Sequence, residues 1–254
     1  MLNILIANDD GITAAGIRAL ADALSEKANI YICAPDSQRS AAGHGITMKK
    51  PVYAEEVEFE GAEKAYAISG TPADCVKLGL KLLAKDGIKI DMVYSGINMG
   101  SNVGTDIIYS GTVAAAVEGA INKIPSVAVS VDSHEAVHFD LACELAVNVL
   151  ENAYDEMDPS VIININTPDL PKDEIKGVKF TKMGIREYYE RFDETIDENG
   201  KVQYWYGGDR VMYDGAHTDI DVIANRENYA RISPIHFDLT AYNYLDKIKD
   251  WGIK

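Results

Sequence analysis

The sequence has few cysteines, and none is arranged to bind a metal or build a disulfide framework. Only Cys33, Cys75 and Cys143 occur, each within an apolar run and far from the others, and there is no CxxC pair. Structural zinc sites and disulfide-rich secreted folds need closely spaced or numerous cysteines. We therefore expect free, buried thiols in a reducing compartment.

Long hydrophobic runs are also lacking. No apolar segment approaches the roughly 20 residues that cross a bilayer. The chain opens on the strand-like segment 2–7 and then meets Asp9, which leaves too little apolar length for a signal peptide. The sequence predicts no membrane association, and we expect a cytoplasmic protein.

Positive charge is scarce. The chain has 24 Lys and Arg residues against 40 Asp and Glu residues, a formal net charge of −16. Such a charge disfavours long-range attraction to a nucleic acid duplex or an anionic membrane. A small anionic substrate still fits, provided that a bound cation supplies the missing positive charge. The acidity by itself indicates little beyond solubility.

Apolar strand-like segments alternate with amphipathic helical segments over most of the chain. Strands are expected at 2–7, 29–33, 88–94, 126–131 and 161–166, and helices at 17–24, 72–83, 112–121 and 136–152, with extended pieces within 52–67. This alternation is typical of an α/β fold with a doubly wound, mostly parallel, Rossmann-like sheet. Ligands of such sheets bind beyond the carboxyl ends of the strands. The loops that follow Ala7, Cys33 and Tyr94 should therefore meet at one edge.

The stretch 95–112 (SGINMGSNVGTDIIYSGT) is the most unusual part of the sequence. It contains four glycines and two asparagines, so we expect little regular structure before the helix that opens with Ser110-Gly111-Thr112. A helix start offers unpaired N–H groups, hydroxyls and the positive end of the helix dipole, which suit a phosphate. An isolated SGT would simply cap a helix. The length and amide content of this loop favour a binding site instead.

Asp9 and Asp10 end the first strand, directly before Gly11. Adjacent strand residues normally point apart, and a lone acid pair would be a solvated loop edge. A turn at Gly11 would let both carboxylates approach one cation. With Ser40 and Asn98 from neighbouring loops they would form an all-oxygen set that suits Mg²⁺, Mn²⁺ or Ca²⁺. Beside a phosphate pocket, this set predicts metal-assisted phosphoryl transfer or hydrolysis.

The histidines add little to this picture. His44 follows the second strand, and we expect it at the surface rather than on a substrate. The other four show no metal-ligand spacing and receive no role: His134, His138, His217 and His236.

Two aromatic stretches, 187–192 and 203–206, flank an acidic turn at 193–200 and predict a long hairpin arm. Its rings either form a satellite cluster on their own domain or dock on another subunit, and we favour docking. Beyond the arm we expect a helix at 219–228, an extended segment at 229–234 and a terminal helix at 239–251. The predicted organisation is a catalytic core at 1–180 and, at 181–254, an arm and C-terminal segment that extend the same domain for oligomerisation.

Several long strings resemble one known family. They are NDDGI from Asn8, QRSAAGHGIT from Gln38, SGTPADCV from Ser69 and SGINMGSNVGTDIIYSGTVAAAVEG from Ser95. INTPDLPKDEIKGVKFTKMG from Ile165 and HTDIDVIANRENYARISPIHFDLTAY from His217 are similar as well. Together they resemble the SurE family, the stationary-phase survival nucleotidases, over nearly the whole chain.

The resemblance implies a function and a set of site residues. The metal ligands fall on Asp9, Asp10, Ser40 and Asn98, with Asp9, Asp10 and Asn98 as the catalytic group. The phosphate contacts fall on Asn8, Ser110, Gly111 and Thr112. The implied reaction removes phosphate from nucleoside 5′-monophosphates, with 3′-monophosphates as a second candidate substrate, and uses one divalent cation, Mg²⁺ or Mn²⁺. The implied assembly is a homodimer or homotetramer with exchanged C-terminal arms.

Two other functions compete with this one. The first is a phosphatase with an aspartate nucleophile of the haloacid dehalogenase type. That class needs two acids separated by one residue, whereas Asp9 and Asp10 are adjacent. The second is a catalytically silent nucleotide or metal sensor that keeps the same pocket. We expect the hydrolase, with attack by a metal-activated water.

Overall fold

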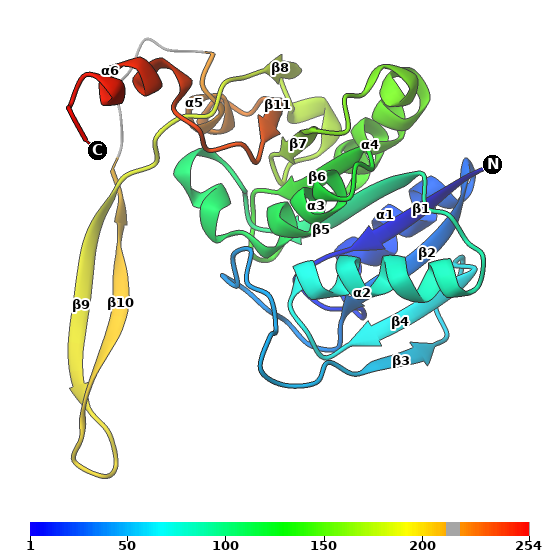
Figure 1. The fold of residues 1–254 in the computed structure, drawn as a ribbon, viewed down its shortest axis with the longest axis horizontal. Coiled ribbons are helices and arrows are strands. Elements are labelled where there is room, and N and C mark those ends of the chain that lie inside the picture. Colours follow the sequence, from blue (N-terminus) through cyan, green and yellow to red (C-terminus); the bar gives the residue numbers. More distant parts are fainter. Residues whose placement is uncertain (212–218, 254) are drawn as a thin grey trace.

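The computed structural model describes residues 1–211 and 219–253. Its main sheet has nine strands in the order β3-β4-β2-β1-β5-β6-β7-β11-β8 (Figure 1). These strands are β1 (Leu2–Ala7), β2 (Ala28–Pro35), β3 (Ala54–Val57), β4 (Lys64–Ile68), β5 (Met92–Met99), β6 (Ser126–Val131), β7 (Val161–Thr167), β8 (Val178–Phe180) and β11 (Ala230–His236). The α-helices are α1 (Ala15–Ser25), α2 (Pro72–Lys85), α3 (Gly111–Ile121), α4 (Asp140–Ala153), α5 (Asp221–Arg226) and α6 (Leu245–Lys249). Short 3₁₀ helices are η1 (Gly104–Tyr109), η2 (Tyr154–Glu156), η3 (Lys172–Glu174) and η4 (Tyr242–Tyr244).

Helices cover both faces of a mostly parallel sheet. Strands β4, β2, β1, β5, β6 and β7 run parallel, while β3 and β11 are antiparallel to their neighbours β4 and β7. In β1, Ile4 and Ile6 join the core beneath α1 and α4, whereas Leu5 joins the core beneath α2. Burial on both faces explains why this strand is almost continuously apolar. The predicted doubly wound α/β fold is confirmed.

The sequence predicted several element boundaries well. Strands β1 and β6 have the expected limits, and α2 begins after Thr71, whose side chain closes a capping box with Asp74. Helix α4 begins at Asp140, four residues after the predicted start at residue 136. The main error concerns 95–112, because strand β5 continues to Met99 and η1 occupies 104–109.

The reason for this error is that β6 continues to pair with β5 beyond the end of β1. Ala7 of β1 pairs with Ser95, while Asn98 and Met99 pair with Ser130 and Val131 of β6. The ladder tolerates the glycine by a bulge between Ser95 and Asn98. Pairing with β6 on both sides of the bulge therefore overrides the local preference of Gly96 for a loop.

The C-terminal segment both projects from the sheet and contributes to it. Strands β9 (Tyr188–Ile196) and β10 (Val202–Arg210) form the predicted hairpin, which extends away from the core (Figure 1). The predicted extended segment is β11, which joins the main sheet beside β7. The helix expected at 219–228 is shorter, and the one expected at 239–251 is divided into η4 and α6. His217 lies outside the described residues.

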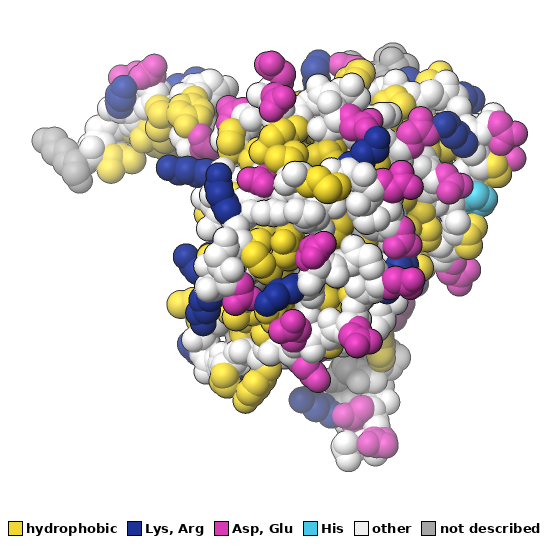
Figure 2. Space-filling model, turned by 90° about the vertical axis from the view of Figure 1, so that its right-hand side faces the viewer, with side chains coloured by type: hydrophobic (Ala, Val, Ile, Leu, Met, Phe, Trp, Pro, Cys, Tyr) yellow, Lys and Arg dark blue, Asp and Glu magenta, His cyan; other side chains and the backbone are white. Residues whose placement is uncertain are grey.

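Acidic side chains are spread over the surface rather than gathered in one place. On the face that Figure 2 shows, Asp and Glu side chains lie among Lys and Arg side chains and small apolar areas. Within residues 1–211 and 219–253, no helix is both long and apolar enough to span a membrane.

Candidate functional site

The carboxyl ends of β1, β2 and β5 bring three loops together. The backbone N–H of Arg39, in the loop after β2, donates to the carbonyl oxygen of Asp9 at 2.7 Å. The backbone N–H of Met99, at the end of β5, donates to the Asp10 carboxylate at 3.1 Å. The loops therefore meet at one edge of the sheet, as the parallel topology predicts.

Asn8 closes the turn that carries the two aspartates. Its side chain is fully buried and bonds Gly11 twice: Nδ2 donates to the Gly11 carbonyl oxygen at 2.8 Å, and Oδ1 accepts from the Gly11 N–H at 3.2 Å. Gly11 has a φ of +99°, a backbone conformation that residues other than glycine rarely adopt. The observed role of Asn8 is thus to fix the turn, and its contact with phosphate stays a prediction.

Asp9 lies against the first turn of α3. It is 6% exposed, and its Oδ1 accepts a hydrogen bond from the Thr112 hydroxyl at 2.5 Å. Gly111 makes this approach possible, because a Cβ there would lie 2.8 Å from the Asp9 Cβ and 2.9 Å from Pro72 Cγ. The candidate metal ligand and the candidate phosphate site are therefore in direct contact.

The two carboxylates are held in an environment that disfavours their charge. Burial raises the pKa of Asp9 to about 6, against the opposing hydrogen bond from Thr112. Burial also raises the pKa of Asp10, which accepts hydrogen bonds from Met99 N–H and, at 3.3 Å, from Gln38 Nε2. A neighbouring cation would favour the ionised forms. This pair is suited to a divalent cation.

Neutral oxygens complete the candidate ligand set. The Nδ2 of Asn98 donates to the Gly100 carbonyl oxygen at 2.7 Å, so its Oδ1 is the atom that can coordinate. Ser40 is exposed and follows Arg39 in the loop attached to Asp9. In the described part of the chain, no three His, Cys, Asp or Glu residues form a metal cluster. Two carboxylates, one amide oxygen and one hydroxyl fit the oxygen preference of Mg²⁺ and Mn²⁺.

Ser110 is the N-cap of α3 and a candidate phosphate contact. Its hydroxyl accepts a hydrogen bond from the Val113 N–H at 3.0 Å. A hydroxyl that accepts can still donate its own proton, so capping and phosphate binding are compatible. The N–H groups of Gly111 and Thr112 belong to the first turn, where backbone donors lack partners within the helix. This helix start can bind an anion beside Asp9.

The structure gives two histidines contacts that the sequence did not show. His44 is exposed, as expected, and its Nε2 lies 3.1 Å from Oε2 of the buried Glu118 on α3. Lys77 of α2 donates to the other oxygen of Glu118 at 2.6 Å, so this carboxylate connects two helices to the loop of Ser40. His134, beyond β6, lies beside Gly100 and close enough to Asp10 to interact with its charge. Because His134 follows a parallel strand, its position in the sequence could have indicated that it lies at this edge of the sheet.

Two residues that flank the hairpin in sequence hold the loop that leads to Ser110: Arg186, just before β9, and Asp221, at the start of α5. The Asp221 carboxylate accepts from the Gly104 N–H at 2.7 Å. The guanidinium of Arg186 donates to Asp106 at 2.8 Å, and the Thr105 hydroxyl donates to the Arg186 carbonyl oxygen at 2.9 Å. Segments remote in sequence thus fix η1 next to the candidate site.

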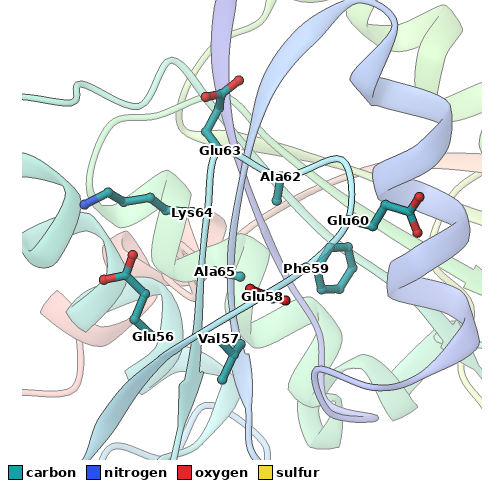
Figure 3. Close-up of a pocket in the computed structure, with 9 residues that line it drawn as sticks. All are labelled: Glu56, Val57, Glu58, Phe59, Glu60, Ala62, Glu63, Lys64 and Ala65. Atoms are coloured by element: carbon teal, nitrogen blue, oxygen red, sulfur yellow. The ribbon is translucent and has the colours of Figure 1, made fainter.

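A hollow of about 380 Å³ lies elsewhere, at the β3–β4 hairpin (Figure 3). Its lining comes from residues 56–60 and 62–65 and includes Phe59, which contacts the guanidinium of Arg18. None of the candidate metal or phosphate residues lines it. We assign no function to this hollow.

Comparisons with known proteins identify the family of this chain. The family model described as Survival protein SurE matches residues 4–190. The 5′-nucleotidase SurE of Synechococcus elongatus is 43% identical, with 97% of this chain and 98% of the relative covered. The 5′-nucleotidase SurE of Pelotomaculum thermopropionicum is 44% identical, with coverages of 98% and 94%. The crystal structure of the SurE protein from Aquifex aeolicus superimposes with a TM-score of 0.83 at 37% identity, covering 98% of each chain. This chain belongs to the SurE family.

Proposed function

We propose that this chain is a divalent-metal-dependent phosphomonoester hydrolase that removes phosphate from nucleoside 5′-monophosphates, and also from 3′-monophosphates. The observation that carries the proposal is the contact between Asp9 and the start of α3, through the Thr112 hydroxyl and across Gly111. This contact supports the proposal, because a carboxylate suited to a cation lies against a helix start suited to an anion. Family membership and the curated relatives, which are named 5′-nucleotidases, support nucleotide hydrolysis.

The residues divide the chemistry between them. Asp9, Asp10, Ser40 and Asn98 would hold Mg²⁺ or Mn²⁺, which when bound lowers the pKa of a coordinated water and polarises the phosphate. Ser110, Gly111 and Thr112 would bind phosphate oxygens and stabilise the charge that develops on them. Thr112 also orients Asp9 by its hydrogen bond, and Asn8 fixes the turn that presents both aspartates.

A panel of nucleoside monophosphates, assayed with Mg²⁺, with Mn²⁺ and with a chelator, tests this function. We expect release of phosphate with either cation and its loss with the chelator. Binding of nucleotide without turnover would instead indicate a sensor. Rapid quenching with labelled substrate tests the route, because label on Asp9 or Asp10 would show an aspartyl phosphate rather than attack by water.

The assembly is part of the same proposal. We expect a homodimer or homotetramer whose subunits contact one another through the β9–β10 arms. Five arm rings are between 62% and 70% exposed: Tyr189, Phe192, Tyr204, Trp205 and Tyr206. A surface of this kind typically marks a protein–protein contact. A cytoplasmic location also remains a prediction, consistent with the three free thiols.

A further inference from the structure

Two large apolar side chains stand exposed at the rim of the candidate phosphate site. Ile108 and Tyr109 end η1 and directly precede Ser110, and they are 69% and 67% exposed. In the loop after β2, which is joined to η1 by the hydrogen bond from Gly43 N–H to Tyr109, Ile46 and Met48 are also exposed, at 42% and 83%. Single exposed apolar residues are ordinary on protein surfaces, but a group around a polar site is characteristic of ligand recognition.

The backbone beneath Tyr109 is firmly held. Its carbonyl oxygen accepts a hydrogen bond from the Gly43 N–H at 3.0 Å, which joins the η1 rim to the loop that carries Ser40. Upstream in η1, Asp106 accepts from the Arg186 guanidinium at 2.8 Å. The ring is therefore exposed to solvent on a fixed backbone. Such a preorganised surface loses little conformational entropy when it binds a ligand.

The position of Tyr109 matches the shape of a nucleoside monophosphate. Ser110, the N-cap of α3, directly follows Tyr109, and adjacent Cα atoms are about 3.8 Å apart. A phosphate bound at the start of α3 therefore lies close to the backbone of Tyr109. The rest of such a substrate must leave the helix start across the rim, and its far end is a flat aromatic base. Every base has a face that stacks on an aromatic side chain, whatever its hydrogen-bonding edge.

We propose that Tyr109, with Ile108 beside it, is the surface on which the base of the substrate stacks. This inference rests on the proposed nucleotidase function and adds the residue that distinguishes a nucleotide from a simpler phosphate ester. Stacking without base-edge hydrogen bonds makes the enzyme tolerant of base identity, with a preference for the larger purines. Tyr206 of the arm lies close enough to Tyr109 to interact electrostatically, so the test must also distinguish base stacking from a subunit contact.

The test compares a substrate that has a base with one that lacks it. Adenosine 5′-monophosphate and ribose 5-phosphate are assayed with wild type, Tyr109→Ala and Tyr109→Phe. We expect Tyr109→Ala to raise KM for the nucleotide about 10-fold, which corresponds to ~1.4 kcal/mol. Both KM for ribose 5-phosphate and kcat should stay near wild type. Tyr109→Phe should restore the nucleotide KM, because it keeps the ring.

Phe180→Ala is the matched control, because Phe180 is a 79% exposed ring on the edge strand β8. This variant should change the KM for neither substrate. An unchanged nucleotide KM in Tyr109→Ala would overturn the proposal, as would an equal loss for both substrates. A fall in molar mass by light scattering, without a change in the ratio of the two KM values, would assign Tyr109 to a subunit contact. If wild type hydrolyses neither ester, the proposed function fails. In that case, calorimetric titration of wild type and Tyr109→Ala with adenosine 5′-monophosphate and with ribose 5-phosphate still tests whether the ring binds the base.

Discussion

The carboxyl edge of the sheet and the β9–β10 arm place their polar and apolar groups in opposite ways. At the edge, polar side chains are buried and paired, as Asn8 is with Gly11 and Thr112 with Asp9. On the arm, aromatic side chains are exposed, and both strands pair with each other as an isolated two-stranded sheet. This contrast fits the proposal that the edge receives a small charged ligand and that the arm contacts an apolar surface of another subunit.

The two regions also differ in what they need for stability. A buried carboxylate such as Asp9 is unfavourable when ionised, which is why burial raises its pKa to about 6. A bound cation would remove this penalty. A two-stranded hairpin is marginally stable alone, so a partner surface over its rings would stabilise it. Substitutions in each region should therefore affect different measurements.

The largest effect is expected from Asp9→Asn. Removal of a residue that merely supports a metal ligand costs about 10–100-fold, so loss of the ligand's charge should reduce kcat/KM by more than about 100-fold. Unfolding by heat in a chelator should not be easier than in wild type, because the buried charge is gone. Asp155→Asn, an exposed acid in η2, is the control and should keep full turnover. Wild-type turnover of Asp9→Asn would contradict the metal assignment.

A smaller loss is expected from Gly111→Ala. The new methyl would lie 2.8 Å from the Asp9 Cβ, so the helix start must move away from Asp9. A displacement near 1 Å at a reacting centre can cost about 100-fold, and we expect kcat to fall about 10–100-fold. Gly119→Ala in the same helix is equally crowded, with a Cβ 2.4 Å from Ser126 Oγ, but it lies remote from Asp9. It should lower the melting temperature without the loss of kcat, and equal kinetics in both variants would refute this explanation.

Glu118→Gln should act on stability more than on turnover. Burial raises the pKa of Glu118, but hydrogen bonds from His44 and Lys77 outweigh it, so the pKa lies below its ordinary value of 4.5. A carboxylate with a lowered folded-state pKa stabilises the protein above pH 4.5, and this contribution is lost as the pH falls through the folded-state pKa. At pH 7 the variant should lose about 1.5–3 kcal/mol of unfolding free energy in denaturant titrations.

The exposed pair of Glu144 with Lys172 provides the control for this stability measurement. Glu144→Gln should cost at most about 1 kcal/mol, because solvent screens surface pairs. The difference between the two variants should shrink in titrations below pH 4. A Glu118→Gln variant as stable as Glu144→Gln at pH 7 would show that the buried network does not hold the edge together.

The smallest effect on activity is expected from shortening the arm. Replacing residues 193–205 by Asn-Gly, a sequence that forms two-residue hairpin turns, leaves Phe192 paired with Tyr206 at the new end. Turnover per chain should stay within about 2-fold, because the edge residues that the structure brings together belong to the core. Light scattering should show a lower molar mass. An unchanged mass would mean that the hairpin packs within its own chain, and a lost turnover would mean that the arm completes a site.

The sequence by itself determined the fold class and the composition of the edge. Continuous apolar runs such as 2–7 and 126–131 indicate strands buried on both faces, and the helical spacing between them requires parallel crossovers. Thr71 and Ser110 mark helix starts by local capping chemistry, and both caps are present. Asp9, Asp10 and Asn98 were placed at one edge by topology alone. Local pattern suffices wherever the relevant partners are a few residues away.

Only the tertiary structure decided where β5 ends, what β11 pairs with and what Glu118 binds. Strand β5 runs past Gly96 because β6 supplies partners for Asn98 and Met99, whereas its pairing with β1 ends at Ser95. The extended segment expected at 229–234 became β11, the strand next to the edge strand β8, because β7 offered it an unpaired side. Glu118 meets Lys77, 41 residues earlier, and His44, 74 residues earlier. These contacts join segments that are far apart in the sequence, so no local pattern predicts them. Hydrogen bonding and burial in the folded chain determine which segments meet.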